Sequence, residues 1–176
     1  MKRSIKLWQF LGFAVTSLGG TILHYLYGWT GDNSFAALFS GINESTWEHM
    51  KLLFFPMLIF SVVQYFFFKD NKSFWCVKLR GILIGLISIP IIFYTINCVF
   101  GQTPDYVNII IFFVSAAIAY IFEYRLFKAD KLTCLTPILA AIILCLIAVA
   151  FFIFTFTPPE IPLFLDPLTN TYGIVG

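Results

Sequence analysis

Five long stretches of this chain contain no Asp, Glu, Lys or Arg, and they constrain its fold more than any other feature. They are residues 7–31, 52–68, 81–104, 106–122 and 132–159. A helix needs about 20 mostly apolar residues to cross the hydrocarbon core of a bilayer. Only 11% of the residues are charged, which is too few to cover the surface of a soluble domain of this length. The sequence therefore predicts an all-α, polytopic transmembrane bundle.

The whole chain, residues 1–176, is expected to form one membrane domain, because no repeat, linker or soluble segment interrupts the apolar runs. The predicted spans cover about 7–29, 46–68, 79–101, 106–127 and 132–157, and an apolar, proline-rich tail follows over 158–176. The first run is longer than the apolar region of a cleaved signal peptide, so we expect an uncleaved anchor. Residues 35–39 are expected to add one interfacial helical turn.

The basic residues predict how the spans are oriented. Short cytoplasmic loops carry an excess of Lys and Arg. All but one of the 11 Lys and Arg residues fall on one side of the predicted topology, and only Lys51 falls on the other. We therefore expect a multi-pass protein of the cell membrane with its N-terminus in the cytoplasm and its tail outside. The net charge of +2 follows from the inner loops and does not indicate a nucleic-acid partner.

Polar residues gather near the predicted outer ends of the spans. Such residues are costly next to lipid, so they usually face a bundle interior or an aqueous cavity and indicate function. We expect an outer-leaflet pocket that binds a small polar or amphiphilic molecule. The candidate ligand-binding residues are His24, Glu44, Glu48, His49, Lys51 and Asn97.

The segment around the second span holds most of these candidates. Ser45 followed three residues later by Glu48 is typical of a capping box, which predicts a helix start there. On a continuous helix Glu44, Glu48 and Lys51 share one face, whereas His49 is turned about 100° away. Two readings stay open for Glu48, as a cap or as a ligand-binding group. Lys51 either pairs with a neighbouring carboxylate, holds an anion or extends toward the interface.

A zinc site is a second interpretation of the same region. Catalytic zinc takes three protein ligands and keeps one position for water. The candidate metal ligands are His24, His49 and Asp166 or Glu48, and the remaining carboxylate would serve as a general base. The chain contains no H-E-x-x-H sequence, and interfacial histidines often have no metal role. No cofactor is firmly implied, and catalytic residues stay unassigned.

Other features concern packing. Gly12, Thr16 and Gly20 predict a close-packed face on the first helix, and Gly81 with Gly85 forms a GxxxG pattern typical of helix packing or dimerisation. Glu123 is expected to pair with a nearby Lys or Arg at the inner surface. The four cysteines show no C-x-x-C spacing, so we expect neither a disulfide framework nor a zinc–thiolate site.

Three segments resemble an uncharacterised family of small bacterial integral membrane proteins. They are the string N-E-S-T-W-E-H at 43–49 with Lys51, the string L-H-Y-L-Y-G-W at 23–29, and the tail motifs P-L-F at 162–164 and Y-G at 172–173. The likeness spans nearly the whole chain. It implies the bacterial inner membrane and no established activity.

Three classes of function follow. The first is a non-enzymatic protein that binds a small molecule or lipid in the outer pocket for uptake, sensing or resistance. The second is a metal-dependent hydrolase of a lipid or envelope substrate. The third is an accessory or scaffold subunit that binds a second copy or a partner through the GxxxG face. The sequence favours the non-enzymatic class.

Overall fold

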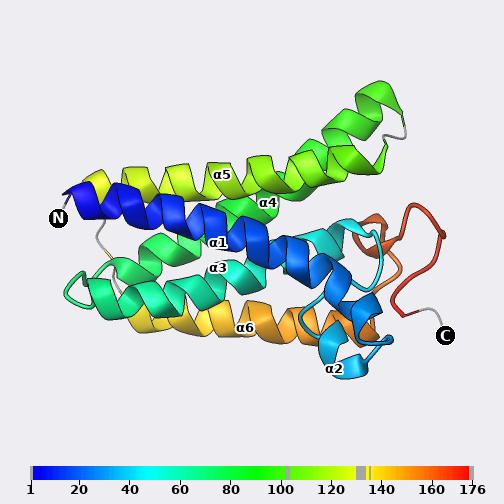
Figure 1. Cartoon of the computed structure of the whole chain (residues 1–176), viewed down its shortest axis with the longest axis horizontal. Coiled ribbons are helices and arrows are strands. Elements are labelled where there is room, and N and C mark those ends of the chain that lie inside the picture. Colours follow the sequence, from blue (N-terminus) through cyan, green and yellow to red (C-terminus); the bar gives the residue numbers. More distant parts are fainter. Residues whose placement is uncertain (1, 102–103, 130–133, 135, 175–176) are drawn as a thin grey trace.

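The computed structural model describes residues 2–101, 104–129, 134 and 136–174, which form a helical bundle (Figure 1). Within these residues five long helices are present: α1 (Lys2–Trp29), α3 (Thr46–Phe68), α4 (Phe74–Phe100), α5 (Asp105–Ala129) and α6 (Pro137–Phe156). Each contains a segment long and apolar enough to cross a membrane. The predicted all-α bundle with five spans is confirmed.

Two short elements complete the fold. Helix α2 (Ser34–Ala37) is the expected interfacial turn, and Asn33 caps it by accepting a hydrogen bond from Phe35 N at 2.8 Å. A 3₁₀ turn, η1 (Pro162–Phe164), lies in the tail.

Three helix starts differ from the expected spans by several residues. Helix α1 begins at Lys2, before the expected start at 7. Helix α4 begins at Phe74, before the expected start at 79, because its first two turns include Lys78 and Arg80, which ended the stretch without charge. Helix α6 begins at Pro137. Proline suits the first turn of a helix, because the N–H groups there have no hydrogen-bond partner within the helix. The expected start of that span, at 132, lies outside the described residues.

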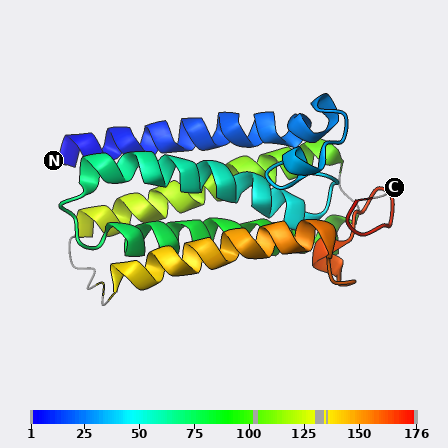
Figure 2. The ribbon, with the colours of Figure 1, turned by 90° about the horizontal axis from the view of Figure 1, so that it is seen from below.

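The helices are arranged around α3 and α4 (Figure 2). Helix α1 packs against α3 and α5, and α4 packs against α3, α5 and α6. Consecutive long helices run in opposite directions, so α1 begins at one end of the bundle and the tail lies at the other (Figure 1). We call the end where α1 begins the basic end, and the end with α2 and residues 157–174 the tail end.

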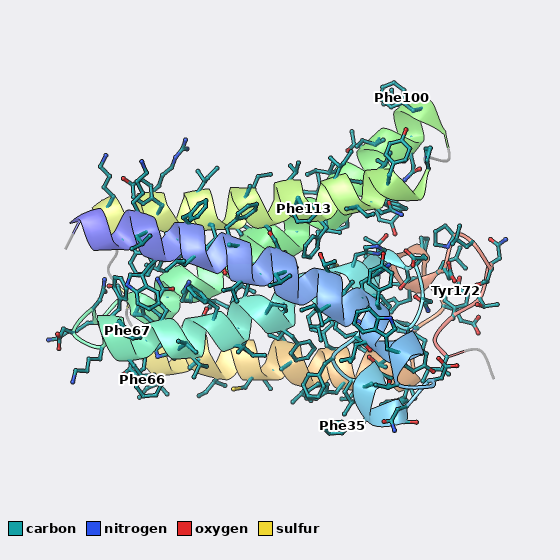
Figure 3. The ribbon with its side chains drawn as sticks, in the orientation of Figure 1. Phe35, Phe66, Phe67, Phe100, Phe113 and Tyr172 are labelled. Carbon is teal, nitrogen blue, oxygen red and sulfur yellow. A yellow bond between two sulfur atoms is a disulfide. The ribbon has the colours of Figure 1, made fainter. Side chains whose placement is uncertain are left out.

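Large apolar side chains cover the outside of the bundle. Phe66, Phe67 and Phe100 are 71%, 66% and 78% exposed, and Figure 3 shows them pointing away from the helices. Helix α6 is the most apolar span, with a mean hydropathy of 3.1. A surface of this kind is stable in lipid and not in water. The chain is therefore an integral membrane protein.

Small residues let the helices approach closely. A Cβ atom on Gly12 would collide with the Tyr120 ring, and one on Gly20 would collide with the Phe112 ring. Thr16, between the two glycines, shares a hydrogen bond of 2.7 Å with Tyr120 Oη. The predicted close-packed face of α1 is confirmed, and it lies against α5.

The GxxxG pattern of α4 is used inside the chain. A Cβ atom on Gly81 would collide with the Glu123 side chain, and one on Gly85 would lie 2.9 Å from Leu53 Cδ2 and 3.0 Å from Ala119 Cβ. These contacts come from α3 and α5. The two glycines therefore pack the bundle together, and their face is covered within one molecule.

The structure corrects the expectation about cysteines, because Cys76 and Cys134 form a disulfide. The two residues are 58 positions apart in sequence, and only the return of the chain after α5 to the start of α4 brings them together. The bridge lies at the basic end. At a cytoplasmic location the reducing environment would keep both thiols free in the cell, without the disulfide. We therefore expect both cysteines to react with a thiol reagent in intact cells.

Fusion proteins test the predicted orientation. Alkaline phosphatase folds only outside the cytoplasm, because it needs disulfides. The positive-inside bias predicts that the enzyme is active when fused after residue 174 and inactive when inserted at residue 71, between α3 and α4. Green fluorescent protein at the same positions should give the opposite pattern. Active phosphatase at residue 71 would contradict the orientation.

Candidate functional site

The loop before α3 is held in place by its own polar residues. Ser45 is the N-cap, and its hydroxyl oxygen accepts a hydrogen bond from Glu48 N at 3.4 Å. Asn43 Oδ1 accepts from Ser45 N at 3.0 Å, and Asn43 Nδ2 donates to Gly173 O in the tail at 3.1 Å. The predicted cap is confirmed. The Glu48 carboxylate, however, does not bind the backbone of Ser45 and instead accepts from Ile42 N at 3.2 Å. It therefore holds the loop three residues before the N-cap.

Glu48 also forms a buried ion pair with Lys51. The Lys51 ammonium lies 2.6 Å from Glu48 Oε2, and it donates to Ala37 O at 2.8 Å and to Thr155 Oγ1 at 2.9 Å. The Lys51 and Glu48 side chains are 0% and 3% exposed. All three ammonium hydrogens have acceptors. This pair ties α3 to α2 and α6, and it does not line the cavities described below.

Glu44 belongs to a different group from the one that the sequence predicted. The helix begins at Thr46, so Glu44 lies in the loop and not on the face of Glu48 and Lys51. Its carboxylate oxygens lie 3.6 Å from His24 Nε2 and 3.5 Å from His49 Nε2. These three residues form the His–Glu–His cluster, in which one donor atom from each residue lies within 4.8 Å of the others.

The His49 ring is oriented by the backbone of α3. Its Nδ1 lies 3.0 Å from Ser45 O, and a carbonyl oxygen can only accept, so Nδ1 carries the hydrogen. In the neutral ring the lone pair is then on Nε2, which faces the Glu44 carboxylate. Two atoms with lone pairs face each other at 3.5 Å. A cation between them, or a proton on the ring, is needed to make this contact favourable.

Asn108 adds an amide next to the cluster. This α5 residue lines a narrow gap together with Glu44 and His49. Its side-chain oxygen is buried and has no hydrogen-bond partner among the described residues. Only the arrangement of α3, α4 and α5 in the bundle shows that Asn108 reaches the cluster.

Two cavities adjoin the cluster. One, of about 70 Å³, lies between α1, α3 and α5. It is lined by both histidines and by apolar residues such as Leu52 and Phe113, the second of which is labelled in Figure 3. The other, of about 250 Å³, lies between the loop and the tail and is lined by Asp32, Glu44 and Asp166. The cluster therefore separates an apolar cavity from an acidic one.

Asp166, the carboxylate proposed from sequence as a third metal ligand, is used to fold the tail. Its two carboxylate oxygens accept from Leu168 N at 2.9 Å and Thr169 Oγ1 at 2.8 Å. It lines the acidic cavity, but Glu44 and not Asp166 is the carboxylate that contacts the histidines. Asn97 donates to Phe93 O within α4 at 2.9 Å.

The tail packs against the start of α3 through aromatic rings. The Trp47 ring centroid lies 4.5 Å from that of Phe151 and 4.7 Å from that of Phe164. Trp47 therefore packs against α6 and the tail. The contact between Trp47 and Phe164 holds the tail in place, and the tail forms one wall of the acidic cavity.

Breaking the Lys51 pair should destabilise the protein strongly. Lys51→Met leaves Glu48 buried without its partner, and loss of one member of a buried pair costs about 3–5 kcal/mol. We expect a clear drop in the thermal unfolding midpoint in detergent. The double variant Glu48→Gln, Lys51→Met should lose less than Lys51→Met alone, because no unpaired charge remains. A single variant as stable as wild type would show that the pair holds nothing together.

The fold and the site define an integral membrane protein with five spans and a His–Glu–His cluster at one end of its bundle. The chain belongs to the family of unknown function DUF6512, whose model matches residues 1–174. The resemblance to an uncharacterised family is thereby confirmed. No curated protein and no solved structure matches the chain.

Proposed function

We propose that the protein binds a divalent transition-metal ion, most suitably Zn²⁺, through His24, Glu44 and His49. The observation that carries this proposal is the orientation of His49. Its Nδ1 is committed to Ser45 O, and its Nε2 faces a carboxylate oxygen at 3.5 Å. Metal-binding histidines typically donate their second ring N–H to a carbonyl or carboxylate in this way.

The distances suit zinc. Two ligands on a tetrahedral zinc ion, each about 2.0–2.1 Å from the metal, lie about 3.3 Å from each other. Glu44 Oε2 lies 3.5 Å from His49 Nε2, and Glu44 Oε1 lies 3.6 Å from His24 Nε2, so each histidine faces its own oxygen of the carboxylate. Imidazole nitrogen with carboxylate oxygen is a donor set that zinc accepts readily. Small side-chain rotations would complete the geometry.

Two histidines and one carboxylate leave a fourth position open. A small polar molecule, or the polar group of an amphiphile, would bind the ion there from the acidic cavity or from the side of Asn108. The metal would thus supply the affinity for the outer-leaflet ligand that the polar residues of the sequence predict. Glu48 and Lys51 would support the site from behind and would not touch the ligand.

Metal-dependent hydrolysis is the second candidate, because three protein ligands with one open position is the arrangement of catalytic zinc. Hydrolysis also needs a general base near the metal-bound water. Glu48, which the sequence offered for this role, is paired with Lys51, and the Asp166 carboxylate accepts two hydrogen bonds within the tail. Binding without turnover is therefore the better supported function.

The basic end of the bundle supports a cytoplasmic location for the start of α1. The metal site would then face the outside of the inner membrane of a bacterium, and the ion and its ligand would enter from there. The scaffold alternative has less support, because Gly81 and Gly85 are already in contact with Glu123, Ala119 and Leu53 of the same chain.

Elemental analysis of detergent-purified protein tests the proposal. We expect about one zinc per chain in wild type, and loss of most of it in His24→Ala, His49→Ala and Glu44→Gln. Glu160→Gln is the matched control, since it removes an exposed tail carboxylate and should leave the zinc content unchanged.

Thermal unfolding then distinguishes loss of metal from loss of fold. Zinc should raise the unfolding midpoint of wild type and of Glu160→Gln, and it should not raise that of the three cluster variants. Folded wild-type protein that takes up no zinc, or cluster variants that retain it, would contradict the proposal.

A further inference from the structure

A second group of polar side chains lies in the other half of the bundle, away from the His–Glu–His cluster. Lys78 of α4 and Glu123 of α5 form an ion pair of 2.6 Å, and both side chains are 0% exposed. The Lys78 ammonium also lies 5.4–5.9 Å from the ring centroids of Phe60, Phe74 and Tyr120. Charged side chains enclosed in a membrane bundle are costly and mark functional positions.

Two glutamines lie at the same level. Gly12 contacts both Phe60 and Tyr120, which fixes the alignment of α1 with α3 and α5. Each of three polar residues lies one helical turn from one of these contact residues: Gln9 from Gly12, Gln64 from Phe60, and Glu123 from Tyr120. Because α3 and α5 run opposite to α1 (Figure 1), each polar residue lies closer to the basic end than its contact residue does. Gln9, Gln64, Lys78 and Glu123 therefore form one polar layer.

The layer contains more hydrogen-bonding groups than it satisfies. Gln9 is 5% exposed and Gln64 is 0% exposed. Among the residues that the structure describes, neither amide has a partner for its nitrogen or its oxygen, and Glu123 Oε1 also has none. An unsatisfied polar group inside a membrane is costly. A stable bundle needs something in this layer that both donates and accepts hydrogen bonds.

We propose that the layer formed by Gln9, Gln64, Lys78 and Glu123 is a second, buried binding site, and that its ligand is a small cluster of water molecules. Water donates to the glutamine and Glu123 oxygens and accepts from the glutamine N–H groups. A metal ion would satisfy only the oxygens, and the Lys78 ammonium would repel it. Buried water typically makes about three such bonds.

The water cluster is distinct from the metal site. The metal site is at the tail end and is built from α1, α3 and the loop before α3, whereas the polar layer lies toward the basic end and takes one side chain each from α1, α3, α4 and α5. Because the ligand is water, the polar layer keeps its role even if no metal binds at the cluster.

Solution NMR of protein in nanodiscs, with nitrogen-15 in the glutamines, tests the proposal directly. The side-chain NH₂ groups of Gln9 and Gln64 should exchange magnetisation with water, although both side chains are buried away from bulk solvent. Single Gln→Met variants assign the signals. If neither amide contacts water, or if the two amides bond only to protein groups, the proposal is wrong.

Thermal unfolding of Gln64→Met gives an independent answer. In a dry layer this variant removes two unsatisfied atoms and raises the unfolding midpoint. In a hydrated layer it removes partners of bound water and lowers the midpoint. We expect a lower midpoint, and an unchanged or higher one would overturn the proposal. Ser61→Ala is the control, because Ser61 Oγ already donates to Met57 O of its own helix, and the variant should change little.

Discussion

The buried Lys51 ammonium is the interaction on which the tail end of the bundle depends. It joins Glu48 of its own helix to Ala37 in α2 and Thr155 in α6. A lone charge in these surroundings would be prohibitively costly, so three acceptors must be present at once. The requirement holds α2, α3 and α6 in one arrangement. Glu48 in turn binds Ile42 N and so fixes the loop that carries Glu44.

The His–Glu–His cluster is a consequence of that fixed loop. Glu44 is held just before the helix, where it reaches His49 on α3 and His24 on α1. The Ser45 carbonyl, at the start of the helix, orients the His49 ring. The string N-E-S-T-W-E-H thus holds the cap, Glu48 of the ion pair and two of the three cluster residues. Lys51 follows two residues after the string, and His24 comes from α1. Trp47 of the same string anchors the tail.

The sequence was sufficient for the fold class, because stretches without charge have few alternatives to crossing a membrane. It was also sufficient for the cap at Ser45 and for the meeting of His24 with His49.

It misplaced Glu44, since the helical-face argument treated the helix as continuous through a residue that precedes the N-cap. Asp166 was predicted as a metal ligand, because nothing in the sequence shows that its oxygens bind the tail backbone and Thr169. The predicted pairing of Glu123 with a nearby basic residue is confirmed by Lys78, and only the close approach at Gly81 shows why both side chains are enclosed.

X-ray absorption at the zinc edge tests the central claim most directly, because it measures the ligands of the bound ion. In zinc-loaded protein we predict a first shell of nitrogen and oxygen at about 2.0–2.1 Å, with the multiple-scattering signature of two imidazoles. His49→Ala should reduce that signature by half or abolish binding. A shell made only of oxygen, or an unchanged spectrum in His49→Ala, would show that the ion binds elsewhere and would contradict the account.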